Sequence, residues 1–295
     1  MKLCPSCGST QVDVDWRCRA CGAVPPRVKG FIALSPDVAH LSIGFRPEYF
    51  ERLAQVEEGN FWFVARNQLI VWATRRFFSS ARKFCEIGCG TGYVLSGIDA
   101  DFPELKLSAT DIYAEGLTFA AARVPHASFL QMDARVMPFE SEFDLVGAFD
   151  VIEHIEQDET VLTRVHRALV KDGGLLLTVP QHPWMWSQQD EHACHVRRYT
   201  SRDLREKLER AGFHIELMTS FVSVLLPLMY ATRRRARVPE EEYDLTAEMR
   251  LHPFINDAMR AVMGVERGLI KAGLKFPLGG SLLVVARKSS EHSYS

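Results

Sequence analysis

The feature that most constrains this chain is a glycine-rich loop between a predicted strand and a predicted helix. The run Glu86-Ile87-Gly88-Cys89-Gly90-Thr91-Gly92 closes the apolar segment that begins at Lys83. Glycines at alternate positions let the backbone turn sharply and approach a ligand closely. Glycines alone also fit an ordinary strand-to-helix turn, so the acids that lie near the loop decide which interpretation is preferred.

Short apolar runs alternate with amphipathic stretches after Lys83, and this alternation predicts the fold. Helices are expected at 158–169 and 201–211, with Gly212 as the glycine that ends the second. Strands that alternate with helices predict an α/β fold with a doubly wound, mostly parallel, Rossmann-like sheet of seven strands. The strands are expected at residues 83–88, 106–111, 127–133, 143–150, 174–180, 213–220 and 281–288.

The chain divides into three regions by composition. Residues 1–27 form a Cys-rich unit, residues 28–80 are expected to be a helical connector or lid, and residues 81–295 the α/β domain. Within that domain, residues 221–280 are expected to be a mainly helical insertion before the last strand. The stretch 49–78 mixes aromatic residues and arginines, so we expect it to pack on the α/β domain or over the mouth of its site.

Acids follow the first three strands of the predicted domain. Glu86 heads the glycine loop, Asp111 ends the second strand and Asp133 ends the third. A carboxylate at Glu86 would repel the pyrophosphate of a dinucleotide. S-adenosylmethionine has no phosphate and carries an ammonium group, so it fits this loop better. Asp111 is placed to bind ribose hydroxyls, and Asp133 to accept a hydrogen bond from the adenine amino group. Each alone could be a helix cap.

The motifs EIGCGTG, TDIY, QMDA and FDLVGAFDVIEHI together resemble the class I S-adenosylmethionine-dependent methyltransferases. The resemblance covers residues 83–219 and is greatest to the bacterial group that includes ubiquinone-biosynthesis O-methyltransferases. The later segments HVRRYT, AGF and PLGGSLLVVARK resemble a bacterial subgroup associated with cell-envelope sugar or lipid pathways. The resemblance implies that the cofactor is held by Glu86, Gly88, Cys89, Gly90, Gly92, Asp111, Ile112, Asp133, Ala134 and Phe149.

Two C-x2-C pairs lie ten residues apart at the start of the chain: Cys4 with Cys7, and Cys18 with Cys21. Four thiolates at this spacing suit a closed tetrahedral zinc site, which is structural because no coordination position stays open. The sequence therefore predicts a small zinc ribbon. Free or redox-active cysteines are the alternative. The role of the ribbon stays open between partner binding, covering of the substrate site and bracing of the N-terminus.

The segment Asp150-Val151-Ile152-Glu153-His154 follows the fourth strand, where an acceptor would meet the cofactor methyl group. It is similar to the E-x-x-E-H pattern of ubiquinone-type methyltransferases, which is implicated in binding a divalent ion. Aspartate replaces the first glutamate here. His154 is accordingly a candidate general base or metal ligand, and a structural residue at the start of the next helix is the alternative.

The loop 179–200 is a second candidate for the acceptor site, because it combines aromatic walls with polar groups. His182 and His195 are candidate bases for removing a proton from an acceptor hydroxyl. Arg197 and Arg198 could bind an anionic group of the substrate, or they could be a solvated pair at the entry of a helix. The predicted substrate-binding residues of this loop are Trp184, Trp186, Arg197, Arg198 and Tyr199.

The bulk properties limit the partners. The formal net charge of the 295 residues is −2, which does not favour general nucleic-acid binding. No signal peptide or apolar run of membrane-spanning length is apparent, so a cytoplasmic location is expected. The apolar run 221–230 beside the arginine cluster 233–237 could touch an anionic membrane or a lipid-linked acceptor; a core-packing helix is the alternative.

Three functions remain at this point. The first is a methyltransferase for a small-molecule acceptor, such as a sugar or a lipid-linked metabolite. The second is an RNA methyltransferase guided by the ribbon, which predicts a continuous basic surface from the ribbon to the cofactor. The third is a module that binds S-adenosylmethionine without catalysis, which predicts an acceptor cavity blocked by its own side chains.

Overall fold

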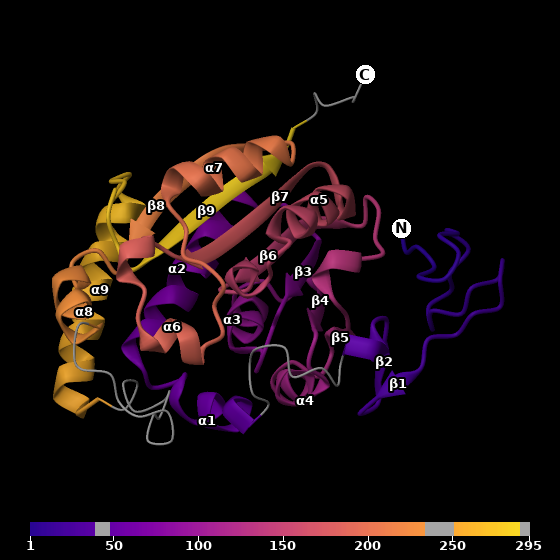
Figure 1. The fold of residues 1–295 in the computed structure, drawn as a ribbon, viewed down its shortest axis with the longest axis horizontal. Helices are drawn as coiled ribbons and strands as arrows, with labels where there is room; N and C mark the ends of the chain where they lie inside the picture. Colours follow the sequence, from indigo (N-terminus) through magenta and orange to yellow (C-terminus); the bar gives the residue numbers. More distant parts are fainter. Residues whose placement is uncertain (39–47, 234–250, 290–295) are drawn as a thin grey trace.

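A mixed sheet of nine strands forms the centre of the molecule (Figure 1). The computed structural model describes residues 1–38, 48–233 and 251–289. The strand order is β1-β2-β5-β4-β3-β6-β7-β9-β8, and β9 runs antiparallel to both of its neighbours. The bounds are β1 Arg27–Val28, β2 Phe31–Ala33, β3 Lys83–Ile87, β4 Lys106–Asp111, β5 Ser128–Gln131, β6 Phe143–Phe149, β7 Leu169–Pro180, β8 Phe213–Phe221 and β9 Ser281–Lys288.

The sheet has nine strands where the sequence predicted seven. All seven predicted strands are present, and β1 and β2 extend the sheet beyond them. β2 pairs in parallel with β5 through Ile32 and Leu130, and β1 pairs antiparallel with β2. β2 and the second residue of β1 lie in the segment 28–80, which was expected to be a helical connector or lid, and the first residue of β1 ends the predicted Cys-rich unit. They have three residues or fewer, too few to show a period of two in the sequence.

Helices cover both faces of the sheet, as a doubly wound fold requires. One face packs against α2, α3, α4 and α9, and the other against α5 and α7. The helices are α1 Glu48–Val56, α2 Phe61–Phe77, α3 Tyr93–Asp101, α4 Ala114–Arg123, α5 Asp158–Ala168, α6 Gln188–His192, α7 Ser201–Arg210, α8 Leu226–Arg233 and α9 Pro253–Lys271.

Local signals in the sequence set several helix ends. The Asn60 side chain accepts a hydrogen bond from the Trp62 amide and so caps the start of α2. The Thr200 side chain does the same for α7 by accepting from the Asp203 amide, 3.0 Å away. Gly212 ends α7 with a φ of +88°, a left-handed conformation that favours glycine. The end of α7 is therefore where its glycine predicted it.

The Cys-rich N-terminal segment packs on the loop that precedes β6. Trp16 is buried and its ring meets the edge of Phe139 at a centroid distance of 5.4 Å. The Leu3 amide donates to the Pro138 carbonyl, 2.8 Å away. In Figure 1 this indigo segment lies at the opposite end of the molecule from α8 and α9. No helix in the part of the chain that the structure describes is long and apolar enough to cross a membrane.

The predicted insertion contains helices where the structure describes it. α8 and α9 lie between β8 and β9, and residues 234–250 fall outside the described residues. The arginine cluster 233–237 is therefore described only at Arg233, which turns inward to Asp190. The apolar run 221–230 is divided between the end of β8 and α8. The division of the chain into 1–27, 28–80 and 81–295 stays a prediction.

Candidate active site

A cavity of about 1210 Å³ opens at the carboxyl ends of the central strands. Ligands bind at this edge in doubly wound folds, because the loops that leave adjacent strands diverge there. The strands β3 to β6 supply one wall, α1 and α2 a second, and α8 and α9 a third. The segment 49–78, expected to lie on the domain or over the mouth of its site, thus contributes directly to the cavity.

The glycine loop makes a sharp turn after β3, and its first glycine packs closely against a neighbouring side chain. Gly88 has a φ of +64°, and a Cβ atom there would lie 2.5 Å from the side chain of Val151. The Gly90 amide donates to Asp111 Oδ2 at 2.8 Å, which ties the loop to the next strand. Gly92 differs from the prediction, because the cavity does not reach it. It packs instead against Ala120 of α4.

Three carboxyl groups at the tips of adjacent strands share this cavity. Glu86, Asp111 and Asp133 are all buried and all line it. Burial raises the pKa of Glu86 to about 8 and that of Asp111 to about 6. Glu86 Oε2 has no hydrogen-bond partner within the described ranges. Asp133 is paired with Arg135 at 2.6 Å.

The remaining residues predicted to hold the cofactor also line the cavity. Cys89 follows Gly88 in the loop, Ile112 follows Asp111, and Ala134 follows Asp133. Phe149 ends β6 beside them. These neighbours add apolar surface next to the three acids, as expected for a pocket with a few oriented polar groups.

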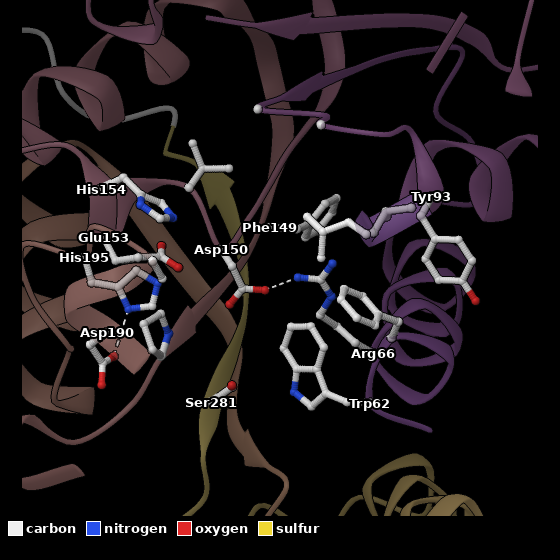
Figure 2. A pocket seen from close by; sticks show the side chains of 18 of the residues that line it. Trp62, Arg66, Tyr93, Phe149, Asp150, Glu153, His154, Asp190, His195 and Ser281 are labelled. Atoms are coloured by element: carbon white, nitrogen blue, oxygen red, sulfur yellow. Dashed lines mark hydrogen bonds and ion pairs between the residues drawn. The ribbon is translucent and has the colours of Figure 1, made fainter. Parts of the chain in front are cut away.

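Sequence reasoning missed an ion pair at the centre of the site. Arg66 of α2 binds Asp150, whose Oδ2 also accepts a hydrogen bond from the Thr178 hydroxyl. The guanidinium lies over the Trp62 ring, 4.5 Å from its centroid. Figure 2 shows Asp150 between Arg66 on one side and Glu153 on the other. The aromatic and arginine content of 49–78 was the only signal for this pair.

A second polar cluster lies beside Asp150. Glu153, His154 and His195 offer ligand atoms that all lie within 4.8 Å of one another. Glu153 is completely buried, and neither carboxylate oxygen has a partner among the residues described. Burial raises its pKa well above the usual value. The rings of His154 and His195 meet edge to face, with centroids 4.8 Å apart. This pairing was not predicted, although each histidine was a candidate.

Asp190 fixes the orientation of His195. His195 Nδ1 lies 2.9 Å from Asp190 Oδ1, so its Nε2 is left for the cavity. Arg198 Nε lies 2.7 Å from the same carboxylate and Arg233 binds its other oxygen. Although burial opposes it, the hydrogen bond from His195 and the two guanidinium groups lower the pKa of Asp190 to about 2. Asp190 is therefore ionised at any working pH.

His154 is held differently. Its Nδ1 lies 3.3 Å from the backbone carbonyl of Cys194. Burial and the neighbouring His195 lower the pKa of His154 to about 4. His154 is consequently neutral near pH 7, and its other ring nitrogen is available to the cluster.

Several residues predicted in the 179–200 loop do not line the cavity. Arg198 does, but His182 stacks on the exposed Trp184 ring with centroids 4.9 Å apart. Trp186 is also exposed and does not line the cavity. Arg197 pairs with Asp158 at 2.7 Å, and the buried Tyr199 hydroxyl donates to the same carboxylate at 2.7 Å. Arg197 and Tyr199 thus fasten the loop to α5, which differs both from the predicted substrate contact and, for Arg197, from a solvated pair.

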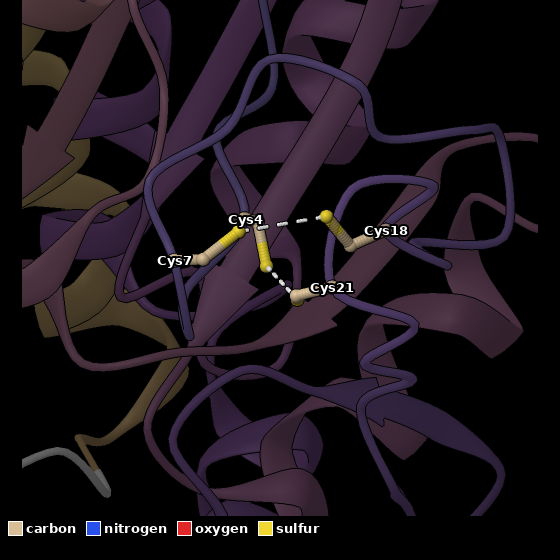
Figure 3. Close-up of side chains that lie close together, drawn as sticks. All are labelled: Cys4, Cys7, Cys18 and Cys21. Carbon is tan, nitrogen blue, oxygen red and sulfur yellow. Dashed lines mark hydrogen bonds between the residues drawn. The ribbon is translucent and has the colours of Figure 1, made fainter.

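The four N-terminal cysteines lie together (Figure 3). Cys4 and Cys21 have sulfurs 3.7 Å apart, and so do Cys7 and Cys18. A disulfide would need about 2.05 Å. Thiolates about 2.3 Å from a tetrahedral zinc ion stand about 3.8 Å from one another, so the geometry of these residues fits zinc.

The fold and the site together define a methyltransferase of the α/β class. Residues 63–217 match the family described as methyltransferase domain. This is more than half of the chain, so the chain belongs to that family.

Curated relatives match only in part. A probable S-adenosylmethionine-dependent methyltransferase of Mycolicibacterium smegmatis is 27% identical over 162 residues, 54% of this chain and 62% of the relative. The malonyl-[acyl-carrier protein] O-methyltransferase of Priestia megaterium is 24% identical over 131 residues, 44% of this chain and 47% of the relative. The chain thus spans less than two thirds of the length of these relatives.

Solved structures share the fold at low identity. Phosphoethanolamine N-methyltransferase 2 of Haemonchus contortus, in complex with S-adenosylmethionine, has a TM-score of 0.51 at 19% identity over 76% of this chain and 53% of that chain. An S-adenosylmethionine-dependent methyltransferase of Thermotoga maritima has a TM-score of 0.52 at 16% identity over 85% of this chain and 100% of that chain. At these identities the likeness concerns the fold.

Proposed function

We propose that this protein transfers a methyl group from S-adenosylmethionine to a small-molecule acceptor. The observation that carries the proposal is that Glu86, Asp111 and Asp133 share one cavity with the glycine loop. In this assignment the methionine ammonium faces Glu86, the ribose hydroxyls bind Asp111 and the adenine lies near Asp133. The membership of the methyltransferase family supports the same reaction.

The cluster beside Asp150 is the proposed acceptor site. Methyl transfer is an in-line displacement, in which the acceptor oxygen bonds to the methyl carbon as the carbon–sulfur bond breaks. The sulfur leaves as a neutral thioether, so alignment supplies much of the rate. A hydroxyl acceptor must also lose its proton. We assign that proton to His195 Nε2, because the bond to Asp190 holds the other nitrogen.

A divalent cation is the alternative occupant of the same cluster. Glu153, His154 and His195 would hold it, since their ligand atoms lie close together and the carboxylate has no described partner. When bound, a cation would lower the pKa of an acceptor hydroxyl. Asp150 is not available for this role, because Arg66 and Thr178 occupy its side chain. Methyl-transfer activity measured with a chelator separates the alternatives. Activity that persists without divalent ions supports a base at His195, and activity that is lost supports a cation.

The structure favours a small acceptor over the other two functions. No ribbon residue in the described part of the chain lines the cavity, which argues against a ribbon that guides RNA to it. The cavity of about 1210 Å³ also exceeds the range of about 300–1,000 Å³ typical of ligand sites. Space for an acceptor therefore remains beside a cofactor, unlike in a blocked, non-catalytic module.

Calorimetry with S-adenosylmethionine tests the cofactor assignment. Asp111→Ala removes the carboxylate assigned to the ribose, and we expect the affinity to fall at least about tenfold, the equivalent of one charge-assisted hydrogen bond. Glu104→Ala is the matched control, because Glu104 is an exposed acid far from the cavity lining. Equal affinities of the wild type and Asp111→Ala would remove the assignment. A methyl-transfer screen of metabolite extracts would then identify the acceptor.

A further inference from the structure

The outer surfaces of α8 and α9 are unusual because they are exposed and apolar. On α9, Phe254 is 77% exposed and Val265 is 66% exposed, and Leu269 is exposed as well. These positions are separated by 11 and 4 residues and therefore lie on one side of the helix. The helix is thus apolar both toward α2 and toward the outside.

The start of α8 continues this surface. The amides of Ser223 and Val224 donate to Glu266 Oε2 of α9, at 2.8 and 2.9 Å, which fixes the two elements together. Val224 and Leu228 are exposed beside that junction. The only charged residue of α8 is Arg233, and it points to Asp190. Figure 1 shows the two helices at one end of the molecule.

Mostly basic side chains border this surface. α9 carries Arg260, Arg267 and Lys271 on one flank, while Asp257 is its only exposed acid. Apolar helix faces with basic borders are suited to an interface of acyl chains and anionic headgroups. A two-fold pair of this chain with antiparallel α9 helices would place the two basic flanks side by side, which is unfavourable.

The cavity opens at the same surface. Leu228 is exposed and also lines the cavity, as do Met229 of α8 and Met259 of α9. Near it, the exposed Trp184 ring contacts Tyr230 of α8 at a centroid distance of 5.6 Å. Aromatic side chains of this kind are enriched at the water interface of membranes.

We infer that the exposed faces of α8 and α9 dock on an anionic lipid bilayer, with the cavity opening toward it. An acceptor with an acyl or polyisoprenoid chain would then reach the cluster at His195 without leaving the lipid. This second step rests on the proposed function, whereas docking itself does not.

Sedimentation with vesicles tests the inference on the full-length protein. The wild type should co-sediment with vesicles of phosphatidylcholine and phosphatidylglycerol. A much smaller fraction of the protein should co-sediment with vesicles of phosphatidylcholine alone. The double variant Phe254→Glu with Val265→Glu should lower the bound fraction at least about tenfold, because it places charge in the apolar layer. Both positions face outward, so folding is unaffected. Val136→Glu is the control, an exposed apolar site outside these helices.

Equal retention of the wild type and the double variant would overturn the inference. So would a dimer of the wild type, in the absence of lipid, that the double variant abolishes, because the surface would then bind a second copy. Calorimetry with S-adenosylmethionine on the same variants keeps the tests apart. A double variant that keeps its cofactor affinity but no longer binds vesicles supports docking. A wild type that does not bind S-adenosylmethionine at all would contradict only the proposed function.

Discussion

Glu86 is a buried carboxyl group that we propose faces the ammonium group of the cofactor. In the free protein its burial keeps the proton on, with a pKa of about 8. No described side chain supplies Oε2 with a hydrogen bond. The folded protein holds this proton more tightly than the unfolded chain does. The free energy of unfolding therefore falls as the pH rises from about 4.5 toward about 8. A cationic ligand group reverses the preference, because it favours the carboxylate.

Cofactor binding should therefore release a proton from Glu86. Between about pH 6.5 and 7.5 we expect the affinity for S-adenosylmethionine to rise by up to about tenfold per pH unit, since less work is needed to ionise the group. Calorimetry in two buffers of different ionisation enthalpy measures the protons released. Glu86→Gln should make the affinity independent of pH in this window. A wild-type affinity that falls with pH would contradict the assignment of the ammonium to Glu86.

His195 is the residue that we propose as the base for the acceptor hydroxyl. With the acceptor from the metabolite screen, His195→Ala should lower kcat by about 10² to 10⁴ while the cofactor affinity stays unchanged. His214→Ala, an exposed histidine of β8, is the control. If kcat is unchanged in His195→Ala, the acceptor needs no base there.

At the scale of elements, two of the seven predicted strands have the expected bounds. β4 and β9 span 106–111 and 281–288 as predicted. Polar residues mark both ends of each of these strands, so their limits could be read locally. β7 begins earlier than expected, at Leu169, across the polar run that contains Asp172. Its pairing with β6 shifts register between Phe143 and Leu145. The sequence of one strand does not predict such a shift, because the shift depends on how two strands pair.

The glycine loop is the element most sensitive to a single methyl group. Gly88→Ala must keep a φ of +64° and accommodate a Cβ atom 2.5 Å from Val151. We expect a loss of roughly 1–3 kcal/mol in the free energy of unfolding, and cofactor binding should weaken as the loop shifts. Gly264→Ala on α9 is the control, since nothing lies within 4 Å and alanine favours helix. Urea denaturation and calorimetry measure both effects; equal stabilities would contradict the close packing.

At the scale of the whole molecule, the site depends on residues far apart in sequence. The loop motifs were predicted because each is contiguous and follows a strand. The pair of Arg66 and Asp150 joins residues 84 positions apart, and His195 meets Glu153 only after the 179–200 loop folds back. Such contacts follow from the packing of α2 and of this loop on the sheet. No local pattern in the sequence predicts them.

The ribbon should hold one metal ion for the whole chain. Elemental analysis is expected to find about one zinc per chain, because four thiolates stand at tetrahedral spacing. Cys4→Ser with Cys18→Ser should lose the zinc and lower Tm, since metal binding contributes to folding. Cys194→Ser, outside the ribbon, should keep it. Zinc retained by the double variant would place the metal elsewhere.

β1 and β2 connect that ribbon to the margin of the sheet. β2 occupies the hydrogen-bonding side of β5 that would otherwise face water. Unpaired strand margins template contacts between molecules, and strands as short as these offer little of their own to a neighbour. The first effect of metal loss would thus be self-association. An unfolded ribbon would release β2, and the exposed edge of β5 would then pair with a strand of another chain.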